Sequence, residues 1–197
     1  MQNREVGNTG IKVSALGIGT MRFKSRENAA EIIRHALPLG LTYFDIGPAY
    51  HWKSFEENAE TWTGAAIAGV PREQMVLSTK AQPRPQGAQV DKGLGIQTRD
   101  QMWQCIENSF KRVGVGHFDF YQFWDMSTED HFQAACGGPA SPLQALREAR
   151  DQGLIKHLGF TCHGTAADMI RWMEAVPDFK ILTLYYNFGI SKIQSLI

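Results

Sequence analysis

Residues 41–80 read LTYFDIGPAYHWKSFEENAETWTGAAIAGVPREQMVLSTK. Leu41–Ile46 is a compact run with the length of a buried strand, and a helical pattern follows from about Phe55 to Ala68. Pro71 ends that helix, and Met75–Thr79 is a second apolar run of strand length. Two strands with a helix between them form a parallel pair joined by a crossover. This stretch therefore predicts an α/β fold with a parallel sheet.

The same alternation continues on both sides of this stretch. No linker or low-complexity tract interrupts it, so we predict a single domain over residues 1–197. The other predicted elements are a hairpin within Arg4–Val13, a strand at Leu16–Gly19, a helix from Ser25 to Gly40, a loop at Ala81–Gly95, a helix from Thr98 to Gly114, a strand at Phe118–Trp124, a loop at Ser127–Ser141, a helix around Leu143–Ala149, a strand at Ile155–Thr161, a helix at Ala166–Ala175 and a strand at Lys180–Tyr186.

Two parallel architectures fit this pattern. A doubly wound nucleotide-binding sheet places GxGxxG after its first strand, whereas Gly17-Ile18-Gly19 lacks the third glycine, so a tight turn explains it better. A (β/α)₈ barrel places its chemistry on the carboxyl ends of its strands. The polar residues at the strand ends therefore decide between the two.

Composition narrows the possible function. The 197 residues include 20 Lys+Arg and 20 Asp+Glu, so the net charge gives no electrostatic reason to expect nucleic acid. No apolar run reaches the roughly 18 residues of a membrane span, and the amino terminus lacks the order of a secretory signal. The three cysteines form no zinc or disulfide pattern. We expect a cytoplasmic enzyme or binding domain.

Three strand-end residues form a possible proton-delivery unit. Asp45 ends one predicted strand and Lys80 follows the next, so both should lie at the same edge of the sheet. A buried Lys80 needs a partner charge, which Asp45 supplies. Tyr50 follows Asp45 by five residues, and a neighbouring ammonium should lower the pKa of its phenol. A tyrosine tuned in this way is suited to protonating a carbonyl oxygen.

The motifs around these residues extend over the whole chain. They are Leu16-Gly17-Ile18-Gly19-Thr20-Met21, Tyr43-Phe44-Asp45-Ile46-Gly47-Pro48-Ala49-Tyr50, Ser78-Thr79-Lys80, Asp119-Phe120-Tyr121-Gln122-Phe123-Trp124, Gly153–Thr161 and Leu184-Tyr185-Tyr186-Asn187. In order and spacing the sequence resembles the aldo-keto reductases. The resemblance implies a TIM barrel whose amino-terminal end is closed by a hairpin, and the reduction of aldehydes or ketones with NADPH.

The resemblance also implies roles for particular residues. Tyr50 would donate the proton, while Lys80 and Asp45 would set the pKa of its phenol. Trp124 and Trp52 would contact the carbonyl substrate, although Trp52 could equally pack across its loop. NADPH would contact Gly19, Thr20, Met21, Asp45, Thr161 and Cys162.

Several positions depart from the family pattern. The family's histidine after the fourth strand is Trp124 here, and an indole N–H donates a hydrogen bond but cannot titrate. The usual Ser-Asn after the fifth strand reads Thr161-Cys162-His163, and the glutamine before the final Tyr-Asn is Thr183. The sequence around Cys162 is more similar to a subgroup that often carries a carboxyl-terminal iron–sulfur region. An iron–sulfur cluster would therefore belong only to a longer form.

Length is the largest departure. Six barrel strands are predicted, whereas a complete (β/α)₈ barrel needs about 250 residues. The family binds the cofactor's 2′-phosphate and pyrophosphate on the seventh and eighth strands, so we expect weak or no NADPH binding by these 197 residues. The two open sheet edges are possible self-association sites.

Two other functions stay open. A non-catalytic binding or regulatory subunit would keep the scaffold, which Trp124 and the missing phosphate site favour and the Tyr50/Lys80 pair opposes. A metal-dependent barrel hydrolase would need clustered ligands at the strand ends. Only His163 is well placed for that role, because His157 lies within a strand and His117 begins one.

Overall fold

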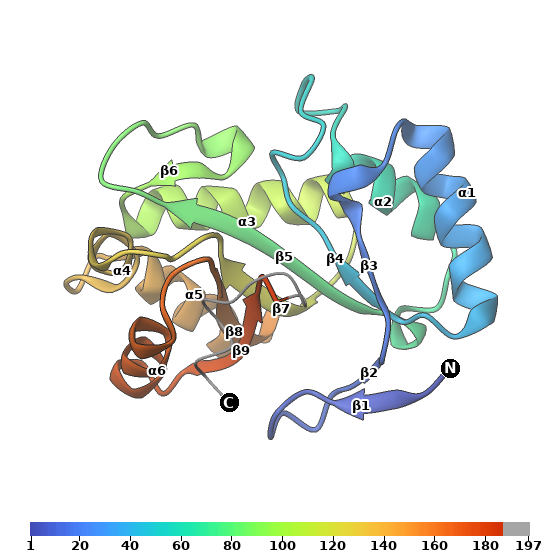
Figure 1. Ribbon diagram of the computed structural model, residues 1–197. Helices are drawn as coiled ribbons and strands as arrows, with labels where there is room; N and C mark the ends of the chain where they lie inside the picture. The colour runs from blue at the N-terminus through green and yellow to red at the C-terminus, as the bar shows by residue number, and fades with distance from the viewer. Residues whose placement is uncertain (187–197) are drawn as a thin grey trace.

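The protein is built around one curved parallel sheet that forms part of a barrel (Figure 1). This computed structural model describes residues 1–186. The strand order is β3-β4-β5-β7-β8-β9, each neighbouring pair is parallel, and β6 pairs with the far end of β5. The strands of this sheet are β3 (Gly17–Gly19), β4 (Tyr43–Asp45), β5 (Val76–Pro83), β6 (Leu94–Ile96), β7 (Phe118–Phe123), β8 (Ile155–Cys162) and β9 (Phe179–Leu184).

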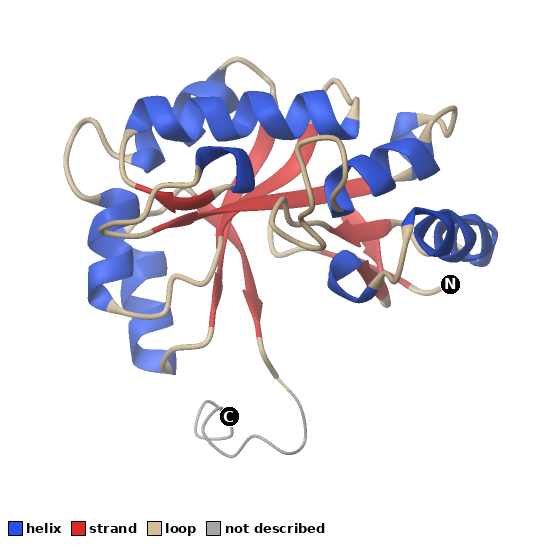
Figure 2. Cartoon of the chain, turned by 90° about the horizontal axis from the view of Figure 1, so that it is seen from above, coloured by secondary structure: helices blue, strands red, loops and turns tan. Residues whose placement is uncertain are grey.

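Helices cover the outer face of the sheet, as Figure 2 shows from above. Each crossover between parallel strands carries its helix on this face, so the predicted parallel α/β barrel architecture is confirmed. The α-helices are α1 (Arg26–Ala36), α2 (Ala59–Ile67), α3 (Arg99–Val113), α4 (Glu129–Cys136), α5 (Pro142–Asp151) and α6 (Ala166–Ala175). Short 3₁₀ turns are η1 (Thr20–Arg22), η2 (Leu37–Leu39), η3 (Arg72–Gln74) and η4 (Val90–Lys92).

The predicted amino-terminal hairpin is present as a separate two-stranded sheet. Its strands β1 (Asn3–Glu5) and β2 (Lys12–Ser14) are antiparallel. Gly7 in the hairpin turn lies close to β9, since a Cβ added there would be 3.6 Å from the Lys180 carbonyl oxygen. The hairpin therefore reaches the last described strand at the end of the sheet where the strands begin.

Three predicted boundaries need correction. Helix α2 begins at Ala59 rather than near Phe55, because the Asn58 side chain accepts hydrogen bonds from the backbone N–H of Glu60 and Thr61 and caps the helix there. Strand β5 runs on to Pro83, so Lys80 lies within this strand and not at its end. The predicted loop at residues 81–95 therefore begins inside β5 and also contains the start of β6.

The segment predicted as a loop at residues 127–141 contains helix α4. Thr128 caps the helix by accepting a hydrogen bond from the His131 N–H, and acidic residues occupy its first turn. Ala135 is fully buried on the inner side of the helix. The Gly137-Gly138-Pro139 run that suggested a loop lies just beyond the end of the helix.

Gly159 on β8 lies directly against β9. A Cβ added at this position would be 2.1 Å from the Ile181 backbone oxygen and 2.4 Å from its Cγ2. The register between β8 and β9 shifts at this point. Only a residue without a side chain lets the two strands approach this closely.

We predict that Gly159→Ala lowers the free energy of unfolding by about 1–3 kcal/mol, because the new methyl group must push β9 away from β8. Gly116→Ala is the matched control, since a Cβ there meets nothing within 4 Å. Urea unfolding followed by circular dichroism measures both variants. Equal stability of the two would contradict the close approach of the strands.

Candidate active site

Asp45 and Lys80 form a buried ion pair at the edge of the sheet where the strands end. Strands β4 and β5 are adjacent, with Asp45 paired to Ser78, and Lys80 follows Ser78 by two residues on the same face. Lys80 Nζ donates to Asp45 Oδ2 across 2.6 Å. The Lys80 side chain is 3% exposed and that of Asp45 is 22% exposed. The predicted pairing is therefore present.

Tyr50 reaches the same ammonium group from the loop after β4. Lys80 Nζ donates to Tyr50 Oη across 3.4 Å. The Tyr50 carbonyl accepts a hydrogen bond from Ala59 N–H at 2.9 Å, which anchors the loop to the start of α2. A Cβ at Gly47 would lie 2.8 Å from the Tyr50 ring, so the glycine leaves room for the phenol to fold back.

The prediction that the pKa of Tyr50 is lowered is wrong. Burial raises the pKa of this phenol above its ordinary value and outweighs the Lys80 ammonium, which lowers it. The Asp45 carboxylate raises the pKa further. Sequence reasoning counted the cation and missed the cost of moving a phenolate out of water. Tyr50 is therefore protonated at neutral pH.

Trp124 lies beside Tyr50 at the end of β7. The two rings meet edge to face with centroids 5.1 Å apart. The Trp124 backbone N–H donates to the Ala81 carbonyl at 2.7 Å, which fixes the start of the loop after β7 against β5. The indole therefore forms one wall beside the phenol.

A cavity of 180 Å³ opens at this edge of the sheet. It brings together six of the residues predicted to act in the site. Its lining consists of Asp45, Tyr50, Lys80, Trp124, Thr161, Cys162, His163, Thr183, Leu184 and Tyr185. The other four were also named from the sequence, His163 as a candidate metal ligand and the three near the end of β9 without a role in the site. A polar cluster of this kind at the carboxyl ends of parallel strands is the usual place for catalysis in a barrel.

The residues predicted to bind the cofactor differ in the hydrogen bonds that they already make within the chain. Gly19 pairs with Asp45 across β3 and β4, and Thr20 follows it. Within the described chain, Thr20 Oγ1 and Asp45 Oδ1 are buried without a hydrogen-bond partner. Thr161 Oγ1 accepts from the Asp125 N–H at 2.7 Å and keeps its own hydrogen to donate. The unpaired oxygen of Asp45, a residue of the cavity lining, fits a polar ligand group. Gly19, Thr20 and Met21 are not among the described residues that line the cavity.

Met21 and Cys162 each accept a hydrogen bond from a group of the chain itself. The Met21 carbonyl accepts a hydrogen bond from His51 Nε2 at 2.9 Å, which ties η1 to the residue after Tyr50. Cys162 Sγ accepts from the Gly164 N–H at 3.1 Å. Burial raises the pKa of the Cys162 thiol, so it lies in the cavity wall as a neutral group.

Trp52 does not line this cavity. Trp52 belongs to the same loop as Tyr50, and its ring lies 5.7 Å from the Arg112 guanidinium. This is a packing contact, and a contact of Trp52 with the substrate stays a prediction.

The loop after β7 is held by a polar cluster around Asp125. Asp125 has a φ of 56°, in the left-handed region that non-glycine residues seldom occupy. Its carboxylate accepts from Arg84 Nη2 at 2.7 Å and also from the Ser127 hydroxyl. His131 Nδ1 lies 3.1 Å from the Asp125 carbonyl oxygen, which links the cluster to α4. These contacts set the position of Trp124 and of the rim.

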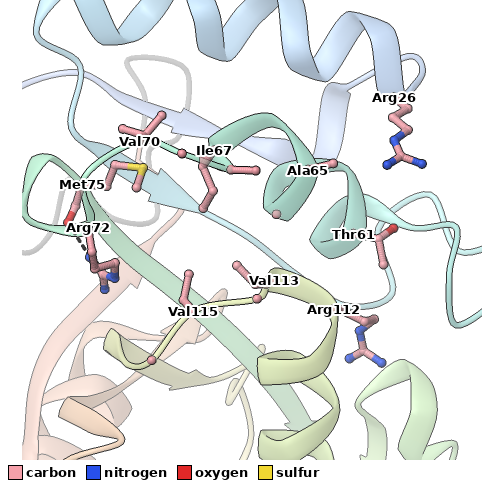
Figure 3. Close-up of a pocket in the computed structure, with 15 residues that line it drawn as sticks. Arg26, Thr61, Ala65, Ile67, Val70, Arg72, Met75, Arg112, Val113 and Val115 are labelled. Carbon is pink, nitrogen blue, oxygen red and sulfur yellow. Dashed lines mark hydrogen bonds between the residues drawn. The ribbon is translucent and has the colours of Figure 1, made fainter.

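A larger hollow of 560 Å³ lies away from these groups, between α2 and the turn that joins α3 to β7 (Figure 3). Two of its arginines already have partners. Arg72 donates to Asp119 at 2.6 Å and Arg112 donates to Glu60 at 2.6 Å. The hollow therefore offers no free charge from either of them.

The histidines do not assemble a metal site in the described part of the chain. Among residues 1–186, no group of three or more histidine, cysteine, aspartate or glutamate side chains is arranged to hold a metal ion. His117 Nε2 lies 3.8 Å from Asp119 Oδ1 at the start of β7, away from the cavity. Over the same residues, no helix has the length and hydrophobicity needed to cross a membrane.

Comparison with known proteins now identifies the family. The sequence model of the aldo/keto reductase family matches residues 15–195. The chain belongs to the aldo/keto reductase family. The resemblance stated from the sequence motifs is thereby confirmed. The roles of Asp45, Tyr50 and Lys80 stay predictions.

Individual curated proteins are similar in sequence to this chain. The chain is 23% identical to L-galactose dehydrogenase of Arabidopsis thaliana over 95% of its own length and 57% of that protein. It is 27% identical to the aldo-keto reductase YhdN of Bacillus subtilis over 95% of its length and 54% of that protein. The chain thus spans little more than half of each relative.

Solved structures of aldo-keto reductases have the same fold. A thermostable aldo-keto reductase, Tm1743, solved with the inhibitor epalrestat, superposes with a TM-score of 0.77 at 22% identity, covering 99% of this chain and 66% of that one. The holo form of the aldo-keto reductase AKR11C1 from Bacillus halodurans gives 0.72 at 20% identity, covering 94% and 58%. The TIM-barrel class of the fold, with about six strands described, is therefore confirmed.

Proposed function

We propose that this aldo-keto reductase family member carries the proton-transfer centre of an NADPH-dependent reductase that converts aldehydes or ketones to alcohols. One observation carries the proposal: Lys80 Nζ contacts both Asp45 Oδ2 at 2.6 Å and Tyr50 Oη at 3.4 Å. This arrangement places a protonated phenol beside a buried ammonium at the open end of the sheet.

In the proposed reaction, Tyr50 transfers its phenolic proton to the carbonyl oxygen of the substrate. NADPH, when bound, would supply the hydride that reaches the carbonyl carbon. The phenolate left on Tyr50 is stabilised by the Lys80 ammonium, which in turn is held by Asp45. Solvent then returns a proton to Tyr50. The raised pKa of Tyr50 favours this direction, because the acid is fully protonated at neutral pH.

We assign the nicotinamide end of NADPH to the residues around the unpaired oxygens. Thr20 Oγ1 and Asp45 Oδ1 are the buried polar atoms that would receive hydrogen bonds from a ligand or, for the hydroxyl, donate one. Thr161 and Cys162 line the cavity together with Asp45, and Gly19 pairs with Asp45 across β3 and β4. We extend the assignment to these residues and to Met21, which follows Gly19 by two positions. Trp124 would contact the substrate and limit its size.

The test is an NADPH titration that follows the fluorescence of the chain's tryptophans, combined with NADPH oxidation in the presence of a small aromatic aldehyde. We expect quenching that saturates only above the micromolar range, and slow oxidation that requires the aldehyde. Asp45→Asn should weaken the quenching further, because it removes the charge that holds Lys80. Absence of oxidation at any NADPH concentration would contradict the proposal for this chain.

A non-catalytic binding subunit is the second candidate, and Trp124 favours it. The family places a titratable histidine there, while the indole at 5.1 Å from the Tyr50 ring can only donate a hydrogen bond. A binding subunit should bind its ligand without turnover, and removal of the Tyr50 hydroxyl should not change the affinity for that ligand.

We also propose a cytoplasmic location and self-association through the sheet edges. Strands β3 and β9 are the two ends of the described strand order. Exposed apolar side chains accompany these edges, with Leu16 62% exposed before β3 and Leu184 37% exposed at the end of β9. Sedimentation velocity over a concentration series would test the association, and a single monomeric species throughout would contradict it.

A further inference from the structure

Behind the sheet, the Glu60 carboxylate joins three elements. Glu60 lies in the first turn of α2 and is fully buried. Its Oε2 accepts from Arg112 Nε of α3 at 2.6 Å, and its Oε1 accepts from the Thr79 hydroxyl of β5 at 2.6 Å. Both carboxylate oxygens are therefore engaged, each by a different element.

Arg112 extends this contact to the loop that carries Tyr50. Its guanidinium lies 4.9 Å from the Phe55 ring and 5.7 Å from the Trp52 ring. Its Nη1 donates to the Asp91 carbonyl at 2.9 Å. Figure 3 shows Arg112 on the last turn of α3, near the start of α2 where Thr61 lies.

The two ends of this chain of contacts are next to the reacting groups. Thr79 immediately precedes Lys80 on β5 and its side chain points to the opposite face. Trp52 and Phe55 follow Tyr50 in the same loop, and the loop is anchored by the hydrogen bond from Ala59 N–H to the Tyr50 carbonyl at 2.9 Å. Glu60 directly follows that anchor. One buried carboxylate thus connects the segment that carries Tyr50 to the strand that carries Lys80.

Packing alone does not require a charge at this position. Elsewhere along the same contact, α2 meets the end of α3 through Gly64, where an added Cβ would lie 2.5 Å from the Val113 oxygen. Burying an ion pair costs desolvation, and apolar residues of similar volume often stabilise a fold equally well. Hydrogen bonds and ion pairs have preferred directions, so the network of Glu60, Arg112 and Thr79 is suited to keeping the elements that it joins at fixed relative positions.

We propose that Glu60, Arg112 and Thr79 are positioning residues that hold the Tyr50 phenol at hydrogen-bonding distance from Lys80. The effect of this positioning on catalysis rests on the proposed reductase function. The effect on the surroundings of the Tyr50 phenol can be measured without turnover. None of the three residues lines the cavity, so they act through Tyr50 and Lys80.

Thr79→Val tests the proposal most cleanly, because it removes the hydroxyl while keeping the shape and the Glu60–Arg112 pair. Thr79→Ser keeps the hydroxyl and should behave like the wild type. In each protein, 3-fluorotyrosine is placed at position 50, and its fluorine NMR signal is followed through an alkaline pH titration. The charged groups that face this phenol are Lys80 and Asp45.

In Thr79→Val we expect the pKa of the residue at position 50 to fall toward the ordinary value of its phenol. Burial is the largest cause of the raised pKa, so a loosened loop that admits water reverses it. If the wild type reduces aldehydes, kcat should fall on the order of tenfold with little change in KM. Thr79→Ser should restore both the pKa and kcat.

Asp119→Asn is the control for a purely structural effect. Asp119 is also buried and paired, with Arg72 at 2.6 Å, but it lies near the start of β7 and away from Tyr50. It should lower stability and leave the pKa at position 50 unchanged. The proposal is overturned if Thr79→Val behaves in the same way. A wild type without turnover would contradict the reductase function alone, because the pKa comparison would still decide the positioning role.

Discussion

Replacing Tyr50 with phenylalanine is expected to lower the rate of carbonyl reduction by roughly 10²–10⁴-fold, the usual contribution of a positioned general acid. The substitution removes only the hydroxyl that Lys80 Nζ contacts at 3.4 Å and keeps the ring that packs against Trp124. NADPH oxidation with and without aldehyde measures the effect. The KM for NADPH should change little, because the lost group acts in the chemical step.

The pH profile provides the internal check on this result. Since burial raises the pKa of Tyr50 above the ordinary value of a phenol, the wild-type rate should be constant through neutral pH and fall only as the phenol loses its proton. Tyr50→Phe should lose this alkaline decline along with the activity. Tyr121→Phe makes the same chemical change at a buried tyrosine whose hydroxyl lies 3.4 Å from Ser109 Oγ, and it should retain the activity. Equal rates in Tyr50→Phe and the wild type would exclude Tyr50 as the acid.

Replacing Arg112 with methionine is expected to lower the free energy of unfolding by about 3–5 kcal/mol, because the fully buried Glu60 carboxylate loses its cation. The side chains of this pair are 1% and 0% exposed, so water cannot take the place of the guanidinium. Urea unfolding measures the loss. The double variant with Glu60→Met should recover part of it, since the unpaired charge is then gone.

Arg171→Met is the matched control for this prediction. Arg171 also forms ion pairs, with Glu129 at 2.7 Å and Asp168 at 2.9 Å, but its side chain is 53% exposed. Pairs of this kind contribute little, so its loss should leave the unfolding curve nearly unchanged. Similar losses of stability in the two variants would mean that the stabilising effect of the Glu60–Arg112 pair does not depend on its burial.

The parallel order of the sheet could be predicted from the sequence because strand length and helix period are local signals. Asp45 and Lys80 could also be paired in advance, because they belong to adjacent parallel strands, although Lys80 lies within β5 and not at its end. Helix α4 was missed because its eight residues lie next to a Gly-Gly-Pro run that dominates a composition-based reading. A local capping pattern at Thr128 was the signal that could have found it.

The direction of the pKa shift on Tyr50 could not be obtained from the sequence. It depends on how deeply the folded chain buries the phenol, and this burial comes from residues distant in the sequence, such as Trp124, whose ring lies 5.1 Å from that of Tyr50. The contact between Glu60 and Arg112 was missed for a similar reason, since 52 residues separate the two and no local pattern connects them. An acidic residue in the first turn of a helix is ordinarily explained by the helix dipole alone.

The position of α4 bears on which parts of this fold tolerate changes of sequence. The contacts that tie Tyr50 to the strand of Lys80 come from α2, α3 and β5. Of the segment 124–141, only Trp124 lines the cavity, and α4 follows it outside the cavity lining. Substitutions in this segment therefore leave the Glu60 contacts in place. A combinatorial library confined to residues 126–140 should yield folded clones at a higher frequency than one of equal size spread over α2 and α3.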